Sequence, residues 1–350
     1  MKVALVHDDL VQWGGAERIL LGLCEIFPNA PIYTSVFDYS NNQLREQFAH
    51  KKIITSFLQK IPAWRSLYKI LLPFYPIAFE QFIFDDFDLV ISNTTRFAKV
   101  VLTKPKTIHI CYCHTPPRFL WNFSSEIYLG LGFLFSKLRI YDRISTNRVD
   151  YFLAGSKNAQ KRIKKAYGRD SRVLYPFIEL EKYKDIEVFD GGYFLVIARL
   201  NKYKRVDLAI EACSKMGVPL KVIGKGNLDI AGDIEFLGEL DDEMVMQVLA
   251  GCRGIIIPGI EDFGLTSLEA QALGKPVIAY GSGGSLETVI ERKTGILFEH
   301  QSTESLIGAL KKMDNIKLKA EDCKENAGKF SKNRFKKEFA KILAKLGYTI

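Results

Sequence analysis

The sequence has few cysteines, and none of them lies in a metal-binding pattern. The 350 residues include six cysteines, with no Cys-x-x-Cys pair and no histidine–cysteine cluster of zinc spacing. Cys111 and Cys113 lie two apart in an apolar run, so both are expected on one side of a strand. This usage predicts core thiols in a reducing cytosol.

Long apolar runs are also missing. No stretch reaches the ~18–20 apolar residues that a membrane-spanning helix needs. The run Val3–Val6 is far too short for the apolar region of a signal peptide. We therefore expect a protein that carries no ordinary secretion signal and does not span a membrane. Low-complexity tracts and short repeats are absent too, so disorder is expected only at the tips.

The composition is that of a globular protein with an excess of positive charge. Hydrophobic residues make up 47% and charged residues 25% of the chain. Its length suits two domains of ~100–200 residues. The net charge of +9 favours an anionic partner, namely nucleic acid, a phosphate-bearing ligand or an acidic membrane, although it can also serve solubility alone.

Short apolar runs alternate with helical patterns along the whole chain, in two series. The strands and helices predicted for the first series are Val3–Val6, Ala16–Ile26, Ile32–Val36, Leu89–Ile91, Ile108–Cys111, Phe152–Ala154 and Asn158–Tyr167. Those of the second series are Phe194–Ala198, Val206–Lys215, Leu220–Ile223, Glu243–Leu249, Ile255–Ile257, Thr266–Leu273, Val277–Ala279, Gly295–Phe298 and Glu304–Lys312. This alternation predicts an α/β fold of parallel sheets with helices on both faces.

A linker separates the two series near Tyr175–Gly192, a charged stretch with a proline and two terminal glycines. We predict one Rossmann-like domain over residues 1–175 and a second over residues 176–330. A long basic helical pattern, Lys317–Leu346, is broken near Gly328 or Phe330. Its last part, residues 331–350, is a C-terminal helix that could pack on either domain.

The strongest chemical signal is the segment Glu261–Glu269, which follows one predicted strand and opens a helix. Unpaired N–H groups at a helix start attract anions, and Gly264 lets a phosphate approach closely. Glu261 lies ahead of the helix and Glu269 within it, so the two carboxylates can bracket a ligand whose phosphate lies between them. Alternatively, Glu261 and Asp262 only cap the helix.

Two more loops of the second series follow predicted strands. Arg199–Arg205 holds four cations, of which Arg199 and Lys204 could neutralise a diphosphate leaving group, unless the loop is a plain solvated turn. Gly224-Lys225-Gly226 is a weak dinucleotide fingerprint, because Asp229 stands where the third glycine would fall.

The first series has two candidate loops as well. Gly14 and Gly15 lie at a strand-to-helix turn, which suggests close approach of the backbone to a ligand. His114 follows the strand Ile108–Cys111 and is either a ligand contact or a structural histidine. In each case the loop follows the carboxyl end of a strand. In two doubly wound domains that face each other, those ends line one interdomain cleft, where we predict the ligand site.

With these motifs the chain resembles glycosyltransferase family 4, with its GT-B fold, over nearly the whole sequence. The matches are Glu261 and Glu269 to the E-x7-E pair, Arg199 and Lys204 to the R-L-x-x-x-K element, and Gly14 and Gly15 to the N-terminal glycine loop. The sequence around His114 resembles a bacterial subgroup with polysaccharide and O-antigen mannosyltransferases.

The resemblance implies roles for the matched residues. The second domain would bind a nucleotide-sugar donor and the first an acceptor. Arg199 and Lys204 would hold the diphosphate, and Glu269 the ribose. Glu261 would contact the donor sugar and His114 would face it, so these two are the catalytic candidates. The other substrate-binding candidates are Gly14, Gly15, Gly224, Lys225, Phe263, Gly264, Leu265 and Thr266.

The resemblance also implies a reaction that retains the anomeric configuration and needs no metal and no cofactor. The sequence agrees, because it has no D-x-D-like metal pair in a suitable loop. Cations and helix N–H donors would then assist the departing nucleoside diphosphate.

Two segments of the first domain, residues 53–84 and 127–148, mix large apolar and basic residues. Lys60, Arg65 and Lys69 lie there among aromatic residues. Such segments suit a membrane interface, although core helices with solvated basic faces would look the same. A lipid-linked acceptor would explain both, so we expect a cytoplasmic protein attached to the inner, anionic face of the membrane.

The resemblance, together with these features, implies a retaining hexosyltransferase that moves mannose from GDP-mannose to a glycan or lipid-linked oligosaccharide in cell-surface polysaccharide synthesis, without a nucleic-acid partner. One alternative is a nucleotide-sugar epimerase of the same fold, which needs no acceptor. Another is a non-catalytic protein that binds a nucleotide sugar or a nucleic acid. The presence of both glutamates favours an enzyme.

Overall fold

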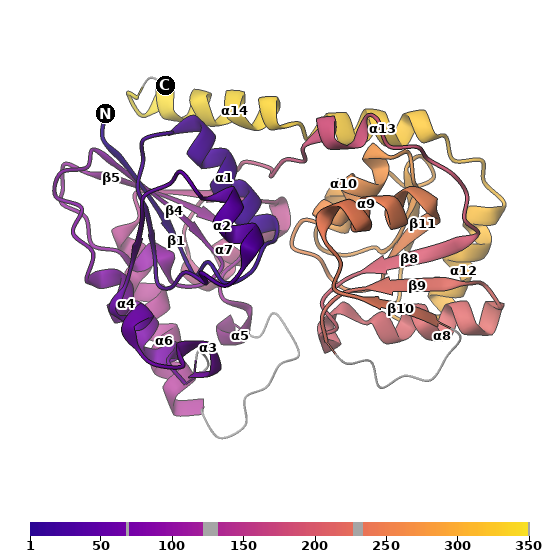
Figure 1. The fold of residues 1–350 in the computed structure, drawn as a ribbon, viewed down its shortest axis with the longest axis horizontal. Helices are drawn as coiled ribbons and strands as arrows, with labels where there is room; N and C mark the ends of the chain where they lie inside the picture. The colour runs from indigo at the N-terminus through magenta and orange to yellow at the C-terminus, as the bar shows by residue number, and fades with distance from the viewer. Residues whose placement is uncertain (68–69, 122–131, 227–233, 349–350) are drawn as a thin grey trace. The chain divides into compact units, whose positions relative to one another are not determined.

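The computed structural model describes residues 1–67, 70–121, 132–226 and 234–348, which fall into two compact units (Figure 1). Unit 1 consists of Met1–Tyr175 with Lys336–Ile350, and unit 2 consists of Pro176–Phe335. Each unit is built on its own parallel sheet with helices on both faces.

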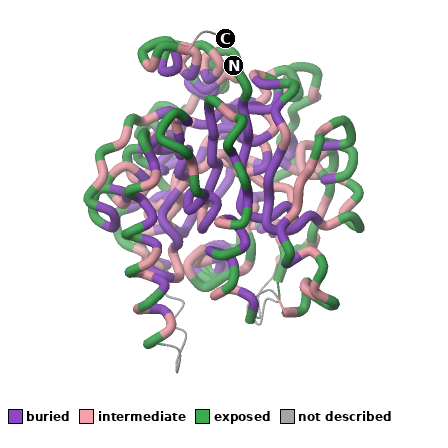
Figure 2. Tube along the Cα trace, turned by 90° about the vertical axis from the view of Figure 1, so that its left-hand side faces the viewer, coloured by how far each residue is buried: buried purple, intermediate pink, exposed green. Residues whose placement is uncertain are grey.

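Unit 1 contains, among its described residues, a seven-stranded sheet of order β3-β2-β1-β4-β5-β6-β7. Its strands are β1 (Val3–His7), β2 (Ile32–Thr34), β3 (Ile53–Thr55), β4 (Leu89–Thr94), β5 (Ile108–Cys113), β6 (Tyr151–Ala154) and β7 (Arg172–Val173). All their pairings are parallel. The central strands are buried along their whole length, as the purple segments of Figure 2 show.

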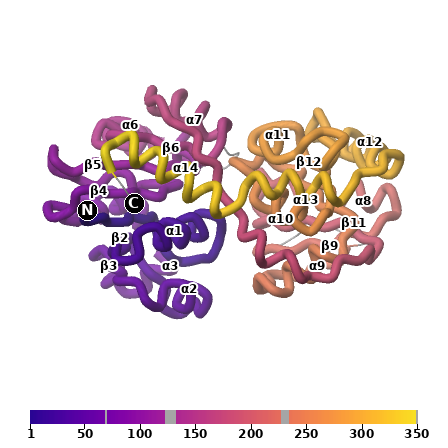
Figure 3. Tube along the Cα trace, turned by 90° about the horizontal axis from the view of Figure 1, so that it is seen from above, coloured from indigo at the N-terminus to yellow at the C-terminus, as the bar shows by residue number. Residues whose placement is uncertain are grey.

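Helices cover both faces of this sheet. They are α1 (Gly15–Ile26), α2 (Asn42–Gln47), α3 (Trp64–Leu67), α4 (Tyr75–Glu80), α5 (Arg118–Trp121), α6 (Gly132–Ser145), α7 (Lys157–Tyr167) and the 3₁₀ turns η1 (Phe57–Lys60), η2 (Leu72–Phe74), η3 (Ala98–Val100) and η4 (Thr146–Arg148). One core joins Val6 and Val90 of the sheet to α4, η3 and α6. The last helix, α14 (Lys332–Lys345), lies beside α1 (Figure 3), where Phe339 packs on Phe27 and Lys336 pairs with Glu25 at 2.8 Å.

Unit 2 has the same order around its first strand, β10-β9-β8-β11-β12-β13. The strands are β8 (Tyr193–Ile197), β9 (Leu220–Ile223), β10 (Ile234–Gly238), β11 (Cys252–Ile257), β12 (Val277–Tyr280) and β13 (Gly295–Phe298). The helices are η5 (Leu180–Tyr183), η6 (Lys202–Lys204), α8 (Val206–Met216), α9 (Asp242–Gly251), α10 (Leu265–Ala272), α11 (Ser285–Thr288), α12 (Thr303–Asp314) and α13 (Ala320–Gly328). Alternate strand residues face opposite cores, so that Val196 packs with α8 and α12 while Leu195 packs with α9 and α10.

The predicted strands of both series are present, so the α/β prediction is confirmed. Three strands, β3, β7 and β10, are not predicted from the sequence. β3 and β7 have only three and two residues, and β10 is a half-exposed edge strand, so none of them has the long apolar run that marks a central strand. The six cysteines are free and buried, as expected.

The basic aromatic segment 53–84 divides between core and surface. Leu58, Tyr75 and Phe79 are buried in the core of unit 1, whereas Phe74 and Ile77 are about half exposed. Part of this segment therefore belongs to the core, and part of it exposes apolar side chains at the surface. Residues 68–69, including Lys69, and residues 127–131 of the second segment lie outside the described residues.

Candidate functional site

Each sheet has one point where its strand order reverses, between β1 and β4 in unit 1 and between β8 and β11 in unit 2. At such a point the loops leave the carboxyl ends of neighbouring strands in opposite directions, and open α/β sheets bind their ligands there. Most candidate residues lie on these loops or on the loops beside them.

The loop after β11 runs into α10 through a left-handed turn at Gly264, whose φ is +100°. Residues with a Cβ rarely adopt this conformation. The turn exposes the first N–H groups of α10, at Leu265 and Thr266, which have no partner within the helix. The loop is also held from the other side, because Gly284 N donates to Glu261 O at 2.9 Å. The start of α10 is thus presented to a ligand by a fixed backbone.

Lys204 and Glu261 meet at the switch point of unit 2. Lys204 Nζ donates to Glu261 Oε1 at 2.5 Å, and the two side chains are 16% and 22% exposed. Lys204 ends the turn η6 after β8, and Glu261 lies on the loop after β11, so neighbouring strands bring them together. A cation and a carboxylate therefore stand side by side, accessible to solvent, ahead of an open helix start.

The loops after β8 and β9 pack closely. Leu200 N donates to Lys225 O at 3.0 Å. A Cβ on Gly224 would lie 1.8 Å from Ala198 O, so only glycine allows this approach. Arg199 is exposed at the same edge. Lys225 is exposed as well and pairs with Glu239 at 3.2 Å.

Two other predicted residues lie deeper. The Phe263 ring is buried and packs edge-on against Phe330 at 5.5 Å, so the ring serves the core and does not face a ligand. Glu269 lies in the second turn of α10 and is half-buried. The structure thus brings Arg199, Lys204 and Glu261 to one edge of unit 2.

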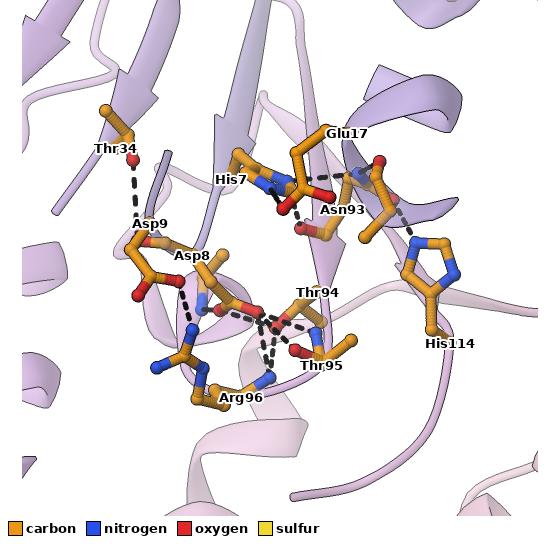
Figure 4. A network of polar contacts seen from close by, with 12 residues as sticks. His7, Asp8, Asp9, Glu17, Thr34, Asn93, Thr94, Thr95, Arg96 and His114 are labelled. Atoms are coloured by element: carbon orange, nitrogen blue, oxygen red, sulfur yellow. Dashed lines mark hydrogen bonds and ion pairs between the residues drawn. The ribbon is translucent and has the colours of Figure 1, made fainter. Parts of the chain in front are cut away.

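In unit 1 the glycine turn and His114 are joined by a buried asparagine. Gly14 caps α1 and Gly15 begins it. His114 directly follows β5, and its Nε2 lies 2.7 Å from Asn93 Oδ1 (Figure 4). Asn93 Nδ2 donates to Ala16 O at 2.8 Å in the first turn of α1. The two candidate loops of unit 1 are therefore neighbours.

A buried His7–Glu17 pair lies behind Asn93 (Figure 4). His7 Nε2 is 3.5 Å from Glu17 Oε1, and His7 Nδ1 is 3.0 Å from Asn93 Nδ2. Burial by itself lowers the pKa of His7, but the hydrogen bond and charge of Glu17 outweigh it, and the pKa is raised.

Asp8 fills the rest of this switch point as a buried anion. It accepts hydrogen bonds from Thr95 N at 2.6 Å and from Ala98 N at 2.8 Å, with further bonds from the same turn. Burial alone would raise the pKa of Asp8, yet the charges of Arg96 and His7 and the backbone N–H donors outweigh burial and lower it. Asp9 pairs with Arg96 beside it.

Four residues of this network are not predicted from the sequence, namely His7, Asp8, Glu17 and Asn93. A signal for two of them was present, because His7 and Asp8 are polar residues at the end of an apolar strand, the criterion that selected His114. Glu17 and Asn93 resemble any helix or strand residue in the sequence. The strand register that pairs His7 with Asn93 reveals the role of Asn93, and the contact of Glu17 with His7 then links Glu17 to the same network.

Over residues 1–67, 70–121, 132–226 and 234–348, no group of three or more His, Cys, Asp or Glu side chains could hold a metal ion. Within these same ranges, no helix is long and apolar enough to cross a bilayer.

Comparison with known families identifies both halves of the chain. The model "Glycosyltransferase Family 4" matches residues 13–182, and the model "Glycosyl transferases group 1" matches residues 181–330. Among curated proteins, the chain is similar to the alpha-1,3/1,6-mannosyltransferase ALG2 of Dictyostelium discoideum, at 27% identity over 85% of this chain and 86% of the relative. ALG2 of Saccharomyces cerevisiae is 26% identical over 86% of this chain and 73% of its own length.

Solved structures agree on the fold. The Anabaena protein HepE, determined with UDP and glucose, superposes with a TM-score of 0.73 at 18% identity and covers 98% of this chain and 99% of its own. Sucrose-phosphate synthase of Thermosynechococcus elongatus gives a TM-score of 0.75 at 15% identity, with 99% of each chain covered. The predicted GT-B fold is thus confirmed, and the family matches decide against an epimerase or a mere binding protein. The two family matches adjoin and together span residues 13–330, so the chain belongs to the glycosyltransferases that these models describe, family 4 in its first half and group 1 in its second, and it is a hexosyltransferase.

Proposed function

We propose that this glycosyltransferase moves mannose from GDP-mannose, with retention of configuration, to a glycan or lipid-linked acceptor of cell-surface polysaccharide synthesis. The observation that carries the proposal is the Lys204–Glu261 pair ahead of the open start of α10. Mannose is supported by the ALG2 relatives, which are named mannosyltransferases.

The chemistry follows from this geometry. Breaking the bond between the anomeric carbon and the diphosphate moves a pair of electrons onto the leaving oxygen. Lys204, Arg199 and the N–H groups at the start of α10 would stabilise this charge. Glu261 would leave its bond to Lys204, accept hydrogen bonds from sugar hydroxyls, and stabilise positive charge at the anomeric carbon. Glu269 would hold the ribose. In unit 1, Gly15 and His114 would contact a sugar substrate.

A thermal-shift screen tests the donor. A ligand that binds only the folded protein stabilises it by RT ln(1 + [L]/Kd). GDP-mannose should therefore raise Tm in proportion to the logarithm of its concentration once that concentration is well above Kd. UDP-glucose, GDP-glucose and UDP-galactose are the comparison ligands. A larger shift with UDP-glucose would overturn mannose from GDP-mannose, and no shift with any nucleotide sugar would overturn the proposed site.

We further propose that the reaction needs no metal, because Lys204, Arg199 and the helix donors can supply the charge that a cation would otherwise provide. Transfer measured in excess EDTA should equal transfer measured in Mg²⁺. Loss of activity in chelator, with recovery on addition of Mg²⁺ or Mn²⁺, would contradict this proposal.

Attachment to an anionic membrane through unit 1 is a separate proposal. The side chains of Phe133, Lys137, Ile140 and Ile144 are exposed, and their spacing places them on one face of α6. Tyr141 of the same helix donates to Glu80 at the end of α4 at 2.6 Å. The neighbouring segment exposes further apolar side chains, namely Ile70, Phe74 and Ile77. Apolar side chains flanked by lysines suit the boundary between headgroups and acyl chains.

Flotation with liposomes tests the attachment. The triple variant Lys60→Glu, Arg65→Glu, Lys137→Glu should no longer float with vesicles that contain phosphatidylserine. A matched control makes the same change in charge on α7, at the exposed residues Lys161, Lys164 and Lys165, and should float like the wild type. Equal flotation of both variants would show that Lys60, Arg65 and Lys137 do not hold the protein to anionic lipid.

A further inference from the structure

Asn93 occupies the centre of the polar network in unit 1. Its side chain is completely buried, and the parallel register of β1 and β4 sets it beside His7. It contacts His7 at 3.0 Å and His114 at 2.7 Å (Figure 4). It also contacts the carbonyl of Ala16 at 2.8 Å. One amide thus joins the end of β1, the first turn of α1 and the residue that follows β5.

The orientation of this amide follows from its partners. Ala16 O is a backbone carbonyl and can only accept, so the group that faces it must be the NH₂ of Asn93. The amide oxygen then faces His114 Nε2. A flipped amide would set two oxygens against each other at Ala16, in a buried site where repulsion is strong.

The orientation of the amide in turn places the proton on His114. An amide oxygen accepts and never donates, so Nε2 of His114 must carry a hydrogen to make this bond. In a neutral imidazole, Nδ1 then holds the lone pair. In that form, the lone pair at Nδ1 has the chemistry of a hydrogen-bond acceptor, which suits a hydroxyl donor such as that of a sugar.

We infer that Asn93 is a positioning residue, which holds His114 in its Nε2–H form and ties it to the glycine turn at the start of α1. The effect on catalysis rests on the proposed function of His114, whereas the position of the proton does not. His7 Nδ1 lies 3.0 Å from the same NH₂ group and 3.1 Å from the backbone carbonyl of Asn93, so the orientation of the amide rests on the carbonyl of Ala16.

Strands β4 and β5 also contain a matched control, the pair of Ser92 and His109. Ser92, the neighbour of Asn93 on β4, faces the opposite side of the sheet, and its Oγ lies 2.9 Å from His109 Nε2. His109 Nδ1 lies 3.2 Å from the carbonyl of Arg148, so this ring has the opposite, Nδ1–H form. Burial lowers the pKa of His109 to about 4, which keeps it neutral near pH 7. His109 is therefore an internal reference for the spectrum of His114.

Imidazole ¹⁵N–¹H NMR of the full chain tests the proton position without any substrate. The sequence has five histidines, and the signals that vanish in His114→Gln assign this ring. We expect an Nε2–H pattern for His114 and an Nδ1–H pattern for His109. The Asn93→Ala variant should lose the preference at His114 and leave His109 unchanged. An Nδ1–H form of His114 in the wild type would overturn the inference, even if every variant failed to fold.

Kinetics test whether the positioning matters. Asn93→Ala should lower kcat by about 10²-fold, the cost of a slightly misplaced group, and change the donor KM little. In a His114→Ala background the same substitution should have no further effect, because Asn93 acts through His114. Ser92→Ala should leave kcat near the wild-type value. Additive losses in the double variant would overturn the inference for catalysis. If no donor gives turnover while the NMR pattern holds, the proposed function fails and the proton position stands.

Discussion

The two units have the same strand order around their first strand, yet they fill the point where that order reverses with different chemistry. In unit 1 the site is closed, because Asp8, Asn93 and Glu17 are buried. Asp8 accepts a hydrogen bond from Ala98 N, and Asn93 donates one to Ala16 O. In unit 2 it is open, with Lys204 and Glu261 partly exposed ahead of a helix start.

The difference shows what the topology decides and what it leaves to the side chains. Parallel order puts loops from neighbouring strands at one edge in both units. In unit 1 those loops carry short polar side chains that satisfy each other, which makes a rigid support for His114. In unit 2 they carry a long cation and a carboxylate that pair with each other and stay partly exposed, so that both charges face solvent.

Removing the charge at the closed site should have the largest effect on stability. Asp8→Asn sets an NH₂ group against backbone donors that now bind a carboxylate. We expect a loss of about 3 kcal/mol of unfolding free energy, the sum of a charged hydrogen bond and a buried donor left unpaired. Urea denaturation measures it, and the exposed Asp170→Asn is the control. A stability equal to the wild type would show that the closed site is not a structural support.

Removing the cation at the open site should slow the reaction and spare the fold. Lys204→Ala should reduce transfer by about 10²–10³-fold, the usual effect of losing one preorganised group that stabilises a leaving group. Its melting temperature should stay near that of the wild type. The control is Lys215→Ala, which removes an exposed lysine on α8. Unchanged kinetics would remove Lys204 from the site.

The two glutamates of unit 2 should separate in their kinetics. Glu261→Gln keeps the shape but loses the charge, so it should mainly lower kcat, by about 10²-fold. Glu269→Gln should mainly raise the donor KM, by roughly tenfold, because it weakens ground state and transition state alike. A large loss of stability in Glu261→Gln with a normal kcat would instead favour the helix-capping interpretation.

The smallest expected effect is the dependence of the unfolding free energy on pH, which two buried histidines of unit 1 control. The pKa of His7 is raised above 6.5, so its contribution to stability is complete below pH 6.5 and is lost as the pH rises through the folded pKa. Burial lowers the pKa of His109 to about 4, so His109 destabilises the fold as the pH falls from 6.5 toward 4. Urea denaturation between pH 4 and pH 9 should show His7→Gln flattening the alkaline side and His109→Gln the acid side. The same slopes in both variants would contradict this assignment.

Much of the fold could be predicted because its signal is local. The apolar runs at Val3 and at Ile255 are flanked by turn residues, and their β-branched side chains mark central strands. β10 has no such signal, because its place at the edge depends on pairing with β9 alone. The loops of Lys204 and Glu261 could be located at strand ends, because strand ends are a local signal. The hydrogen bond between the two side chains could not be predicted, because it depends on which strands become neighbours in the sheet.

The sequence by itself determined that the chain alternates strands and helices and that its charged loops follow strand ends, since both properties depend on neighbouring residues. Only the tertiary structure decided which of those loops meet. Asn93 lies 86 residues from His7 and 21 from His114, and nothing in the intervening sequence specifies their contact. It arises because β4 returns beside β1, and a hydrogen bond between distant residues exists only after the sheet has set their register.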